Sequence, residues 1–256
     1  MKTNYYSGFI CEEGKAVFDI HSHILPGVDD GSGNMYDSIE MLQLAADSGT
    51  LGIVATPHCN IPGVFDNYYN ENFCRRLEQL KKTVKEKNIL IEIYSGQEVF
   101  LATQFEEHLK RNEFITINNS RYMLTELDFK IDEKSATERL EKLISYGYLP
   151  IISHPERYGF VVENPGIIAK LRSLGCLVQV NSGSVIGYFG RRVQKTADII
   201  LRNRLADFFA SDAHSQYSRT PDLSQTHELI CENISYSYAD VLLKTNPFKV
   251  INNETI

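Results

Sequence analysis

Residues 17–31 read VFDIHSHILPGVDDG, in which a short apolar run passes directly into histidines and aspartates. The run at 17–20 lacks a clean alternation of apolar and polar residues, as expected of a parallel strand that is buried on both faces. His21 and His23 stand two positions apart at its end. Because residues two apart on a strand point to the same side, both imidazoles can reach one metal ion.

Short apolar runs of this kind recur at 17–20, 52–56, 90–94, 122–125, 150–153, 177–180 and 207–210. Between them, apolar residues repeat with helical spacing, most clearly at 73–84, 136–144 and 193–201. Strand and helix patterns alternate with a step of roughly 30 residues, which is typical of βα units. We predict one α/β domain over residues 1–256, a (β/α) barrel of seven strands in which 1–15 is an N-terminal extension. A doubly wound open sheet is the alternative.

Side chains that can bind metal ions collect where the predicted strands end. Five of the seven histidines follow a strand directly, and acidic residues occupy equivalent positions. In a parallel barrel all these ends lie on the C-terminal face, where active sites form. The sixth strand ends at Asn181 and supplies no strong ligand candidate. The candidate ligands are His21, His23, Asp30, His58, Glu98, Glu126, His154, Asp212 and His214.

Imidazole nitrogens and carboxylate oxygens together are a ligand set for Zn²⁺, Mn²⁺ or Fe²⁺. One H-x-H pair is a weak signal, but ligands at successive strand ends are a strong one, so the sequence predicts a metal centre. Taken singly, His58 also fits a hydrogen-bonded residue at a helix start, Glu98 a helix cap and Glu126 a solvated loop acid. Asp29, in an Asp-Asp-Gly turn, is interpreted as a turn residue.

Three further residues with reactive side chains are assigned no chemical role. His108 and His227 lie in helical, charged surroundings and are interpreted as surface residues. Cys59 follows His58 directly and is interpreted as a packing residue.

Composition limits the classes of function. The formal net charge is −7 and the pI about 5.5, which argues against binding to nucleic acid through phosphate contacts. Five widely spaced cysteines without a C-x-x-C pair favour a reducing compartment. No signal peptide and no run of 18 apolar residues is found. We expect a soluble, cytoplasmic protein that is not inserted in a membrane.

The motifs D-x-H-S-H-x-L-P-G-x-D-D-G, T-P-H, G-x-E, H-P-E-R-Y and S-D-x-H follow one another from Asp19 onward. With them the chain resembles the polymerase-and-histidinol-phosphatase (PHP) family, and within it the bacterial manganese-dependent protein-tyrosine phosphatases of capsule and exopolysaccharide operons. The similarity extends to the region of Asn246-Pro247-Phe248. It implies a distorted (β/α)₇ barrel, the PHP fold, with up to three ions of Mn²⁺, for which Fe, Zn or Co can substitute.

The resemblance also implies how the ligands are divided. The first ion is then held by His21, His23, Glu98 and Asp212. The second takes Glu98 as a bridge, with Glu126 and His154, and the third takes Asp30, His58 and His214. The sequence departs from the family's pattern at Cys59, where many relatives have a second histidine.

Hydrolysis is expected to use a metal-activated water. Two ions about 3.5–4 Å apart that share a carboxylate lower the pKa of a shared water, which then attacks phosphorus in line. Arg157, close to His154 in sequence, is predicted to hold the phosphoryl group bidentately, with an ion pair to Glu156 as the alternative. The resemblance adds Arg219. A cysteine nucleophile is excluded, because none of the five cysteines has the C-x₅-R spacing.

The resemblance implies a phosphotyrosine-containing protein as substrate, such as the tail of a membrane-associated bacterial tyrosine kinase that controls polysaccharide export. Histidinol phosphate, or another small phosphomonoester, is the alternative on the same site. A nuclease is disfavoured by the negative charge, and an amidohydrolase by glutamates where many of those enzymes have a bridging lysine. A non-catalytic binding module would be expected to have lost ligands. The sequence leaves the oligomeric state open and allows a homo-oligomer.

Overall fold

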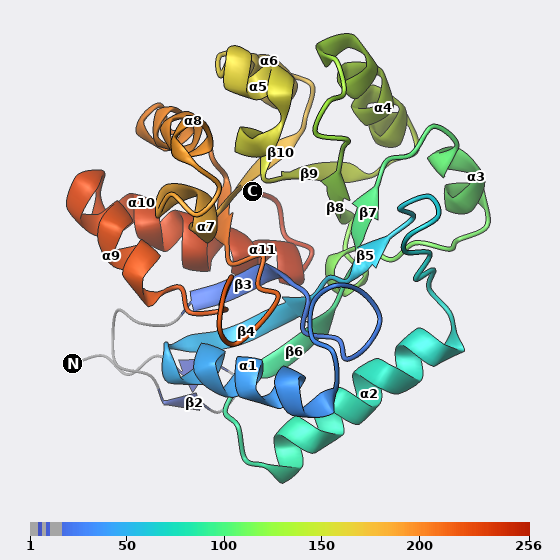
Figure 1. Cartoon of the computed structure of the whole chain (residues 1–256), viewed down its shortest axis with the longest axis vertical. Helices are drawn as coiled ribbons and strands as arrows, with labels where there is room; N and C mark the ends of the chain where they lie inside the picture. Colours follow the sequence, from blue (N-terminus) through green and yellow to red (C-terminus); the bar gives the residue numbers. More distant parts are fainter. Residues whose placement is uncertain (1–4, 7–8, 11–16) are drawn as a thin grey trace.

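Parallel strands occupy the centre of the molecule, with helices packed around them (Figure 1). The structure is a computed structural model that describes residues 5–6, 9–10 and 17–256. Most of the expected extension at 1–15 therefore lies outside the described residues. Its described parts, β1 (Tyr5–Tyr6) and β2 (Phe9–Ile10), pair in antiparallel fashion.

Each predicted apolar run contains or overlaps a strand. The strands are β3 (Val17–Ser22), β4 (Thr50–Ala55), β5 (His58–Cys59), β6 (Glu92–Ser95), β7 (Glu98–Phe100), β8 (Tyr122–Glu126), β9 (Leu149–Ser153), β10 (Leu177–Asn181) and β11 (Phe208–Ala210). They pair in parallel in two sheets, β3-β4-β6 and β11-β10-β9-β8-β7-β5.

Two barrel strands are broken, and each therefore appears as two elements. β4 pairs with β6, and after a short gap β5 pairs with β7, so both pieces of one strand have the same neighbour. Gly96 lies in the second gap, where a Cβ atom would meet Val54 Cγ1 at 2.8 Å. A side chain at that position would push the two strands apart. The breaks make this a distorted barrel with seven strand positions.

The barrel closes between its first and last strands. The His23 amide donates to the Ala213 carbonyl at 2.8 Å, and the Asp212 amide donates to the His21 carbonyl at 2.9 Å. The Asp19 carboxylate, fully buried on β3, accepts a hydrogen bond from the Ser211 hydroxyl just after β11. The predicted seven-stranded barrel is confirmed, and the open-sheet alternative is wrong because its outer strands would stay unpaired.

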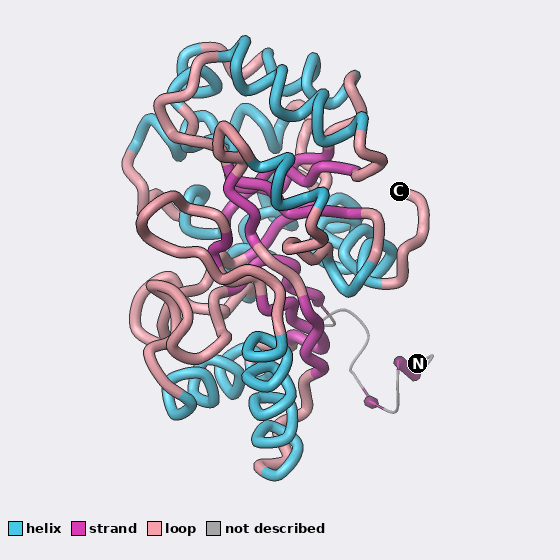
Figure 2. Tube along the Cα trace, turned by 90° about the vertical axis from the view of Figure 1, so that its right-hand side faces the viewer, coloured by secondary structure: helices cyan, strands magenta, loops and turns pink. Residues whose placement is uncertain are grey.

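Helices with one apolar face cover the strands (Figure 2). They are α1 (Met35–Asp47), α2 (Glu71–Glu86), α3 (Phe105–Lys110), α4 (Glu133–Ser145), α5 (Gly159–Glu163), α6 (Ile167–Ser173), α7 (Ser182–Val185), α8 (Arg191–Arg202), α9 (Ser224–Asn233), α10 (Tyr236–Asp240) and α11 (Asn246–Ile251). None of those in the described part of the chain combines the length and apolar character needed to cross a membrane.

The predicted helical stripes face the strands. On α2 all four residues of the stripe, from Phe73 to Val84, are buried. The side chains of Asn70 and Asp132 start α2 and α4, because each accepts a hydrogen bond from a backbone amide in the first turn. At the amino-terminal ends of the strands, α11 adds Val250 and Ile251 to a core cluster of strand residues. The opposite, carboxyl-terminal face is thereby left to the loops.

The packing of α4 can be tested by removing one buried side chain. Leu140 is fully buried in the largest core cluster, so Leu140→Ala should lower the free energy of unfolding by about 2–5 kcal/mol. Glu138→Ala, on the exposed face of the same helix, should change it by less than about 0.5 kcal/mol. Urea denaturation followed by circular dichroism measures both values. Equal effects of the two substitutions would contradict the placement of this helix face.

Candidate metal centre

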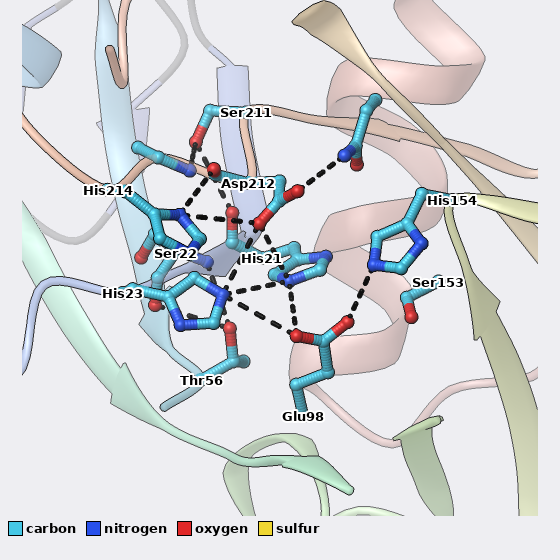
Figure 3. A network of polar contacts seen from close by, with 12 residues as sticks. His21, Ser22, His23, Thr56, Glu98, Ser153, His154, Ser211, Asp212 and His214 are labelled. Carbon is cyan, nitrogen blue, oxygen red and sulfur yellow. Dashed lines mark hydrogen bonds and ion pairs between the residues drawn. The ribbon is translucent and has the colours of Figure 1, made fainter. Parts of the chain in front are cut away.

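The structure brings all nine predicted ligands together at the carboxyl-terminal face of the barrel. Figure 3 shows the imidazoles of His21, His23 and His154 turned toward the Glu98 carboxylate. The side chains of His21, His23 and Glu98 are fully buried, whereas that of Asp30 is 56% exposed. The site therefore has a buried floor and an open edge.

Four ligand atoms from three strand ends form the first group. His21 Nε2 lies 3.2 Å from His23 Nε2, 3.3 Å from Glu98 Oε2 and 3.4 Å from Asp212 Oδ1. His23 Nε2 lies 3.5 Å from the same Glu98 oxygen and 3.3 Å from the same Asp212 oxygen. Ligands about 2.0–2.2 Å from a tetrahedral ion would be about 3.3–3.6 Å apart. The spacing of this group thus matches the edges of a coordination tetrahedron.

The second group uses the other oxygen of Glu98. Glu98 Oε1 lies 3.0 Å from His154 Nε2, and Glu126 Oε1 lies 3.7 Å from the same nitrogen. His58 Nδ1 lies 3.0 Å from Glu98 Oε2 and 3.6 Å from Glu126 Oε2. Because the two oxygens of Glu98 face different imidazoles, this carboxylate stands between two groups of ligands.

The third group lies at the open edge of the site. Asp30 Oδ1 is 3.5 Å from His58 Nε2 and 3.4 Å from His214 Nε2. These three side chains come from loops that are far apart in sequence, after β3, at the start of β5 and after β11. The Asp30 carboxylate is the only one of the three that is largely exposed.

The donor atoms fit metal ions better than they fit one another. Glu98 Oε2 and His58 Nδ1 are buried 3.0 Å apart, yet neither forms a hydrogen bond with any described residue. His214 Nε2 is likewise buried, with no hydrogen bond to the described part of the chain. Buried polar atoms without such partners are costly, and a bound cation would satisfy all three.

Opposite charges hold the first group in place when no ion is considered. Burial raises the pKa of the Glu98 carboxyl, but the imidazoles of His21 and His58 outweigh it and bring that pKa well below its usual value. Burial lowers the pKa of His21, but Glu98 and Asp212 outweigh it and raise that pKa to about 9. Without an ion, His21 therefore carries a proton at neutral pH.

The second group is charged differently. Burial, and then the nearby charge of Glu98, raise the pKa of Glu126 to about 8. Burial, and then the charge of Arg157, lower the pKa of His154 to about 4. His154 is therefore neutral at pH 7 and can act as a ligand without losing a proton, whereas Glu126 must lose one.

Side chains behind the ligands orient them. His21 Nδ1 bonds Gln179 Oε1 at 2.9 Å, and His23 Nδ1 bonds Asp29 Oδ2 at 2.7 Å, so both Nε2 atoms face the centre. The Asp29 carboxylate is fully buried and also accepts the His58 backbone amide. The interpretation of Asp29 as a turn residue is therefore incomplete, and its role could not be found from the Asp-Asp-Gly pattern.

The sixth strand position contributes orienting residues instead of ligands. Gln179 lies on β10, and Asn181 ends this strand and donates to Asp212 Oδ2 at 2.5 Å. Two uncharged polar residues inside an otherwise apolar run were the available sequence signal for this role.

Local backbone geometry aims several ligands. His154 and Asp212 have positive φ angles of 35° and 52°, a conformation that side chains other than glycine adopt rarely. In β3 the register with β4 shifts between Asp19 and Ser22, which re-aims His21 as bulges beside active sites commonly do. Such strained positions cluster at functional sites.

Both predicted arginines converge on Asp212. Arg157 Nη1 lies 3.5 Å, and Arg219 Nη2 2.5 Å, from Asp212 Oδ2. Glu156 is not the ion-pair partner of Arg157 in the described structure, because its buried carboxylate accepts from the Asn181 amide and the Ser184 hydroxyl. The ion-pair alternative for Arg157 is therefore wrong as to its partner.

The residues without an assigned role have other partners. His108 is partly buried, bonds Glu113 at 2.7 Å and stacks on Tyr68, while His227 is partly buried on α9 near Cys231. Both are thus less exposed than a surface interpretation implies. Cys59 is fully buried, and burial raises the pKa of its thiol far above the usual value, so the thiol stays protonated.

Comparison with known proteins gives consistent matches over nearly the whole chain. A family described as "Capsular polysaccharide synthesis, CpsB/CapC" matches residues 17–252. The tyrosine-protein phosphatase YwqE of Bacillus subtilis is 34% identical over 242 residues, covering 94% of this chain and 93% of YwqE. The tyrosine-protein phosphatase CpsB of Streptococcus pneumoniae is 30% identical over 245 residues, covering 94% and 100%.

Solved structures agree. A chain from the crystal structures of YwqE and CpsB, described as unique metal-dependent tyrosine phosphatases, matches with a TM-score of 0.86 and 32% identity, covering 93% of this chain and 96% of that one. A phosphotriesterase homology protein of Escherichia coli matches with a TM-score of 0.59 at 14% identity, over 94% of this chain and 100% of that one. The second match concerns the fold alone.

Metal binding should depend on pH, because ions must displace protons. The raised pKa values of His21, about 9, and of Glu126, about 8, mean that both groups are protonated at pH 7 in the metal-free protein. The apparent affinity for Mn²⁺ should therefore rise between pH 6 and pH 8, and binding should release protons. Calorimetric titration in buffers of different ionisation enthalpy counts these protons. An affinity independent of pH would contradict the charge states given above.

The orienting role of Asp29 can be tested separately from ligand binding. Asp29→Asn keeps the shape of the side chain but weakens its hold on His23 Nδ1, so metal affinity should fall by about 10–100-fold. Asp37→Asn, on the exposed first turn of α1, is the matched control and should leave affinity unchanged. Competition with a chromophoric chelator measures both. Asp29 would be a turn residue only if the two variants bound Mn²⁺ equally well.

Proposed function

This chain belongs to the CpsB/CapC family of capsular polysaccharide synthesis, and we propose that it hydrolyses phosphotyrosine in proteins with a water activated by bound metal ions. It is an enzyme, a phosphoric monoester hydrolase. The observation that carries the proposal is the position of Glu98, whose two oxygens face separate sets of imidazoles within a chain similar throughout to metal-dependent tyrosine phosphatases.

We propose three ion positions, divided as the family resemblance implies. The distances of the first group support His21, His23, Glu98 and Asp212 as its ligands. The second would be held by Glu98, Glu126 and His154, and the third by Asp30, His58 and His214. Mn²⁺ is the proposed ion, since mixed nitrogen and oxygen donors accept it, although Fe, Zn or Co suit the same donors.

When bound, the ions would lower the pKa of a water molecule and neutralise charge on the phosphoryl oxygens. The chain itself supplies the arginines for binding the phosphoryl group. Arg157 and Arg219 share the Asp212 Oδ2 atom, which leaves further N–H groups of each guanidinium for phosphoryl oxygens. Asp212 thereby fixes the arginines relative to the ligand atoms that its Oδ1 approaches.

A protein substrate is supported by exposed side chains in the loops at the same face. Val64, in the loop after β5, is 64% exposed, and Tyr217, in the loop after β11, is 85% exposed. We propose that the phosphotyrosine lies in a flexible segment, such as the tail of a membrane-associated bacterial kinase. Unpaired thiols at the four described cysteines support a cytoplasmic location. The family match over 17–252 supports a single domain.

Hydrolysis of a phosphotyrosine peptide by metal-stripped protein tests the function directly. Activity should return with Mn²⁺, and His21→Ala should lower kcat/KM by more than about 100-fold, because it removes a ligand of the first group. Cys59→Ser should stay within about twofold of the wild type, because the buried, protonated thiol cannot be the nucleophile.

Histidinol phosphate is assayed in parallel to separate substrate from site. Turnover of histidinol phosphate alone would refute the tyrosine phosphatase while leaving the metal centre intact. A loss in Cys59→Ser as large as that in His154→Ala would refute the metal-activated water.

A further inference from the structure

The guanidinium of Arg157 lies between two aromatic rings. Its Cζ atom is 4.6 Å from the centroid of the Phe129 ring and 4.3 Å from that of Phe189. Phe129 comes from the loop after β8, Arg157 from the loop after β9, and Phe189 from the segment between α7 and α8. With a ring on each face, the guanidinium is open to polar partners mainly along its edge.

Phe189 also contacts the second arginine of the site. Arg219 Cζ is 5.6 Å from the Phe189 centroid, within the range of a cation–π interaction. Both arginines already share Asp212 Oδ2. One aromatic ring and one carboxylate therefore contact the same two guanidiniums, although the arginines are 62 positions apart in sequence (219 − 157).

The Phe189 ring is itself held by its segment. A Cβ atom on Gly183 would lie 3.0 Å from the ring, so the missing side chain makes room for it. The Tyr188 ring packs edge-on at 5.1 Å. Gly187 and Gly190 have φ angles of 86° and 90°, which allow the tight turn that returns the chain to α8.

We propose that Phe189 is a positioning residue, which holds Arg157 and Arg219 in the orientation that binds the phosphoryl group of the substrate. The inference rests on the proposed phosphatase function and adds a residue to it. Long arginine side chains lose rotational freedom on binding, and packing against a rigid ring removes part of that loss in advance. Asp212 fixes one end of each guanidinium, and the ring fixes its plane.

The kinetic test compares side chains of similar size that differ in aromatic character. Phe189→Leu should lower kcat/KM for a phosphotyrosine peptide with Mn²⁺ by about tenfold, because it removes the π face from both arginines. Phe189→Tyr keeps that face and should stay within about twofold. Ile186→Ala, exposed in the same segment, is the matched control and should equal the wild type.

Inorganic phosphate provides a second reading of the same clamp. Its competitive inhibition constant should rise in Phe189→Leu and stay constant in Phe189→Tyr and Ile186→Ala. If Phe189→Leu kept the wild-type kcat/KM while Phe189→Ala lost it, the ring would serve only to fill space, and the proposal would be overturned.

A measurement on metal-free protein separates this proposal from the phosphatase itself. With ¹⁵N-labelled arginine, the Nε–Hε signals of Arg157 and Arg219 are assigned from Arg157→Lys and Arg219→Lys. Both signals should move in Phe189→Leu, because the ring current is lost, and neither should move in Ile186→Ala. Unmoved signals in Phe189→Leu would overturn the positioning role. An inactive wild type with moved signals would refute only the enzymatic function.

Discussion

Carboxylates and imidazoles share a buried space at the mouth of the barrel, and their charges must compensate one another there. A buried charge without partners is too costly to retain, so each ionised group in this space requires an opposite charge or a bound ion. Asp212 is at the centre of this balance. One of its oxygens faces the imidazoles of His21 and His23, and the other accepts from two arginines and Asn181. The metal-ligand set and the proposed phosphate-binding set therefore meet on a single side chain.

The barrel is distorted where the site needs it to be. Two of its strands break shortly before their ends, and the second pieces, β5 and β7, pair so that His58 lies opposite Glu98. Continuous strands would be straighter there and would not give the extra turn between Ala55 and His58. Closure of the barrel between β3 and the segment after β11 brings His21 and His23 next to Asp212, although the residues are nearly 200 positions apart. Fold and site thus depend on the same hydrogen bonds.

Much of this could be predicted from the sequence because parallel strands leave a simple signature. Short apolar runs separated by helical stripes indicate βα units, and ligand residues at their ends must converge on one face. Positions such as His58 and His154 were found by this reasoning alone. The orienting residues could not be found in the same way. Asp29 resembles any aspartate in a turn, and Gln179 resembles an ordinary polar residue on a strand, until the structure shows their contacts with His23 and His21.

By itself, the sequence determined the βα order of the chain, the metal-ligand character of the site and the residues that supply the donors, because all three depend on local patterns and on the chemistry of side chains. Only the tertiary structure decided which oxygen of Glu98 faces which imidazole, which partner Arg157 takes, and which aromatic rings enclose that arginine. These relations join residues from different loops, and their distances follow from barrel closure, strand breaks and left-handed backbone positions such as His154. Sequence spacing carries no information on such distances, since the loops that set them have no periodic pattern.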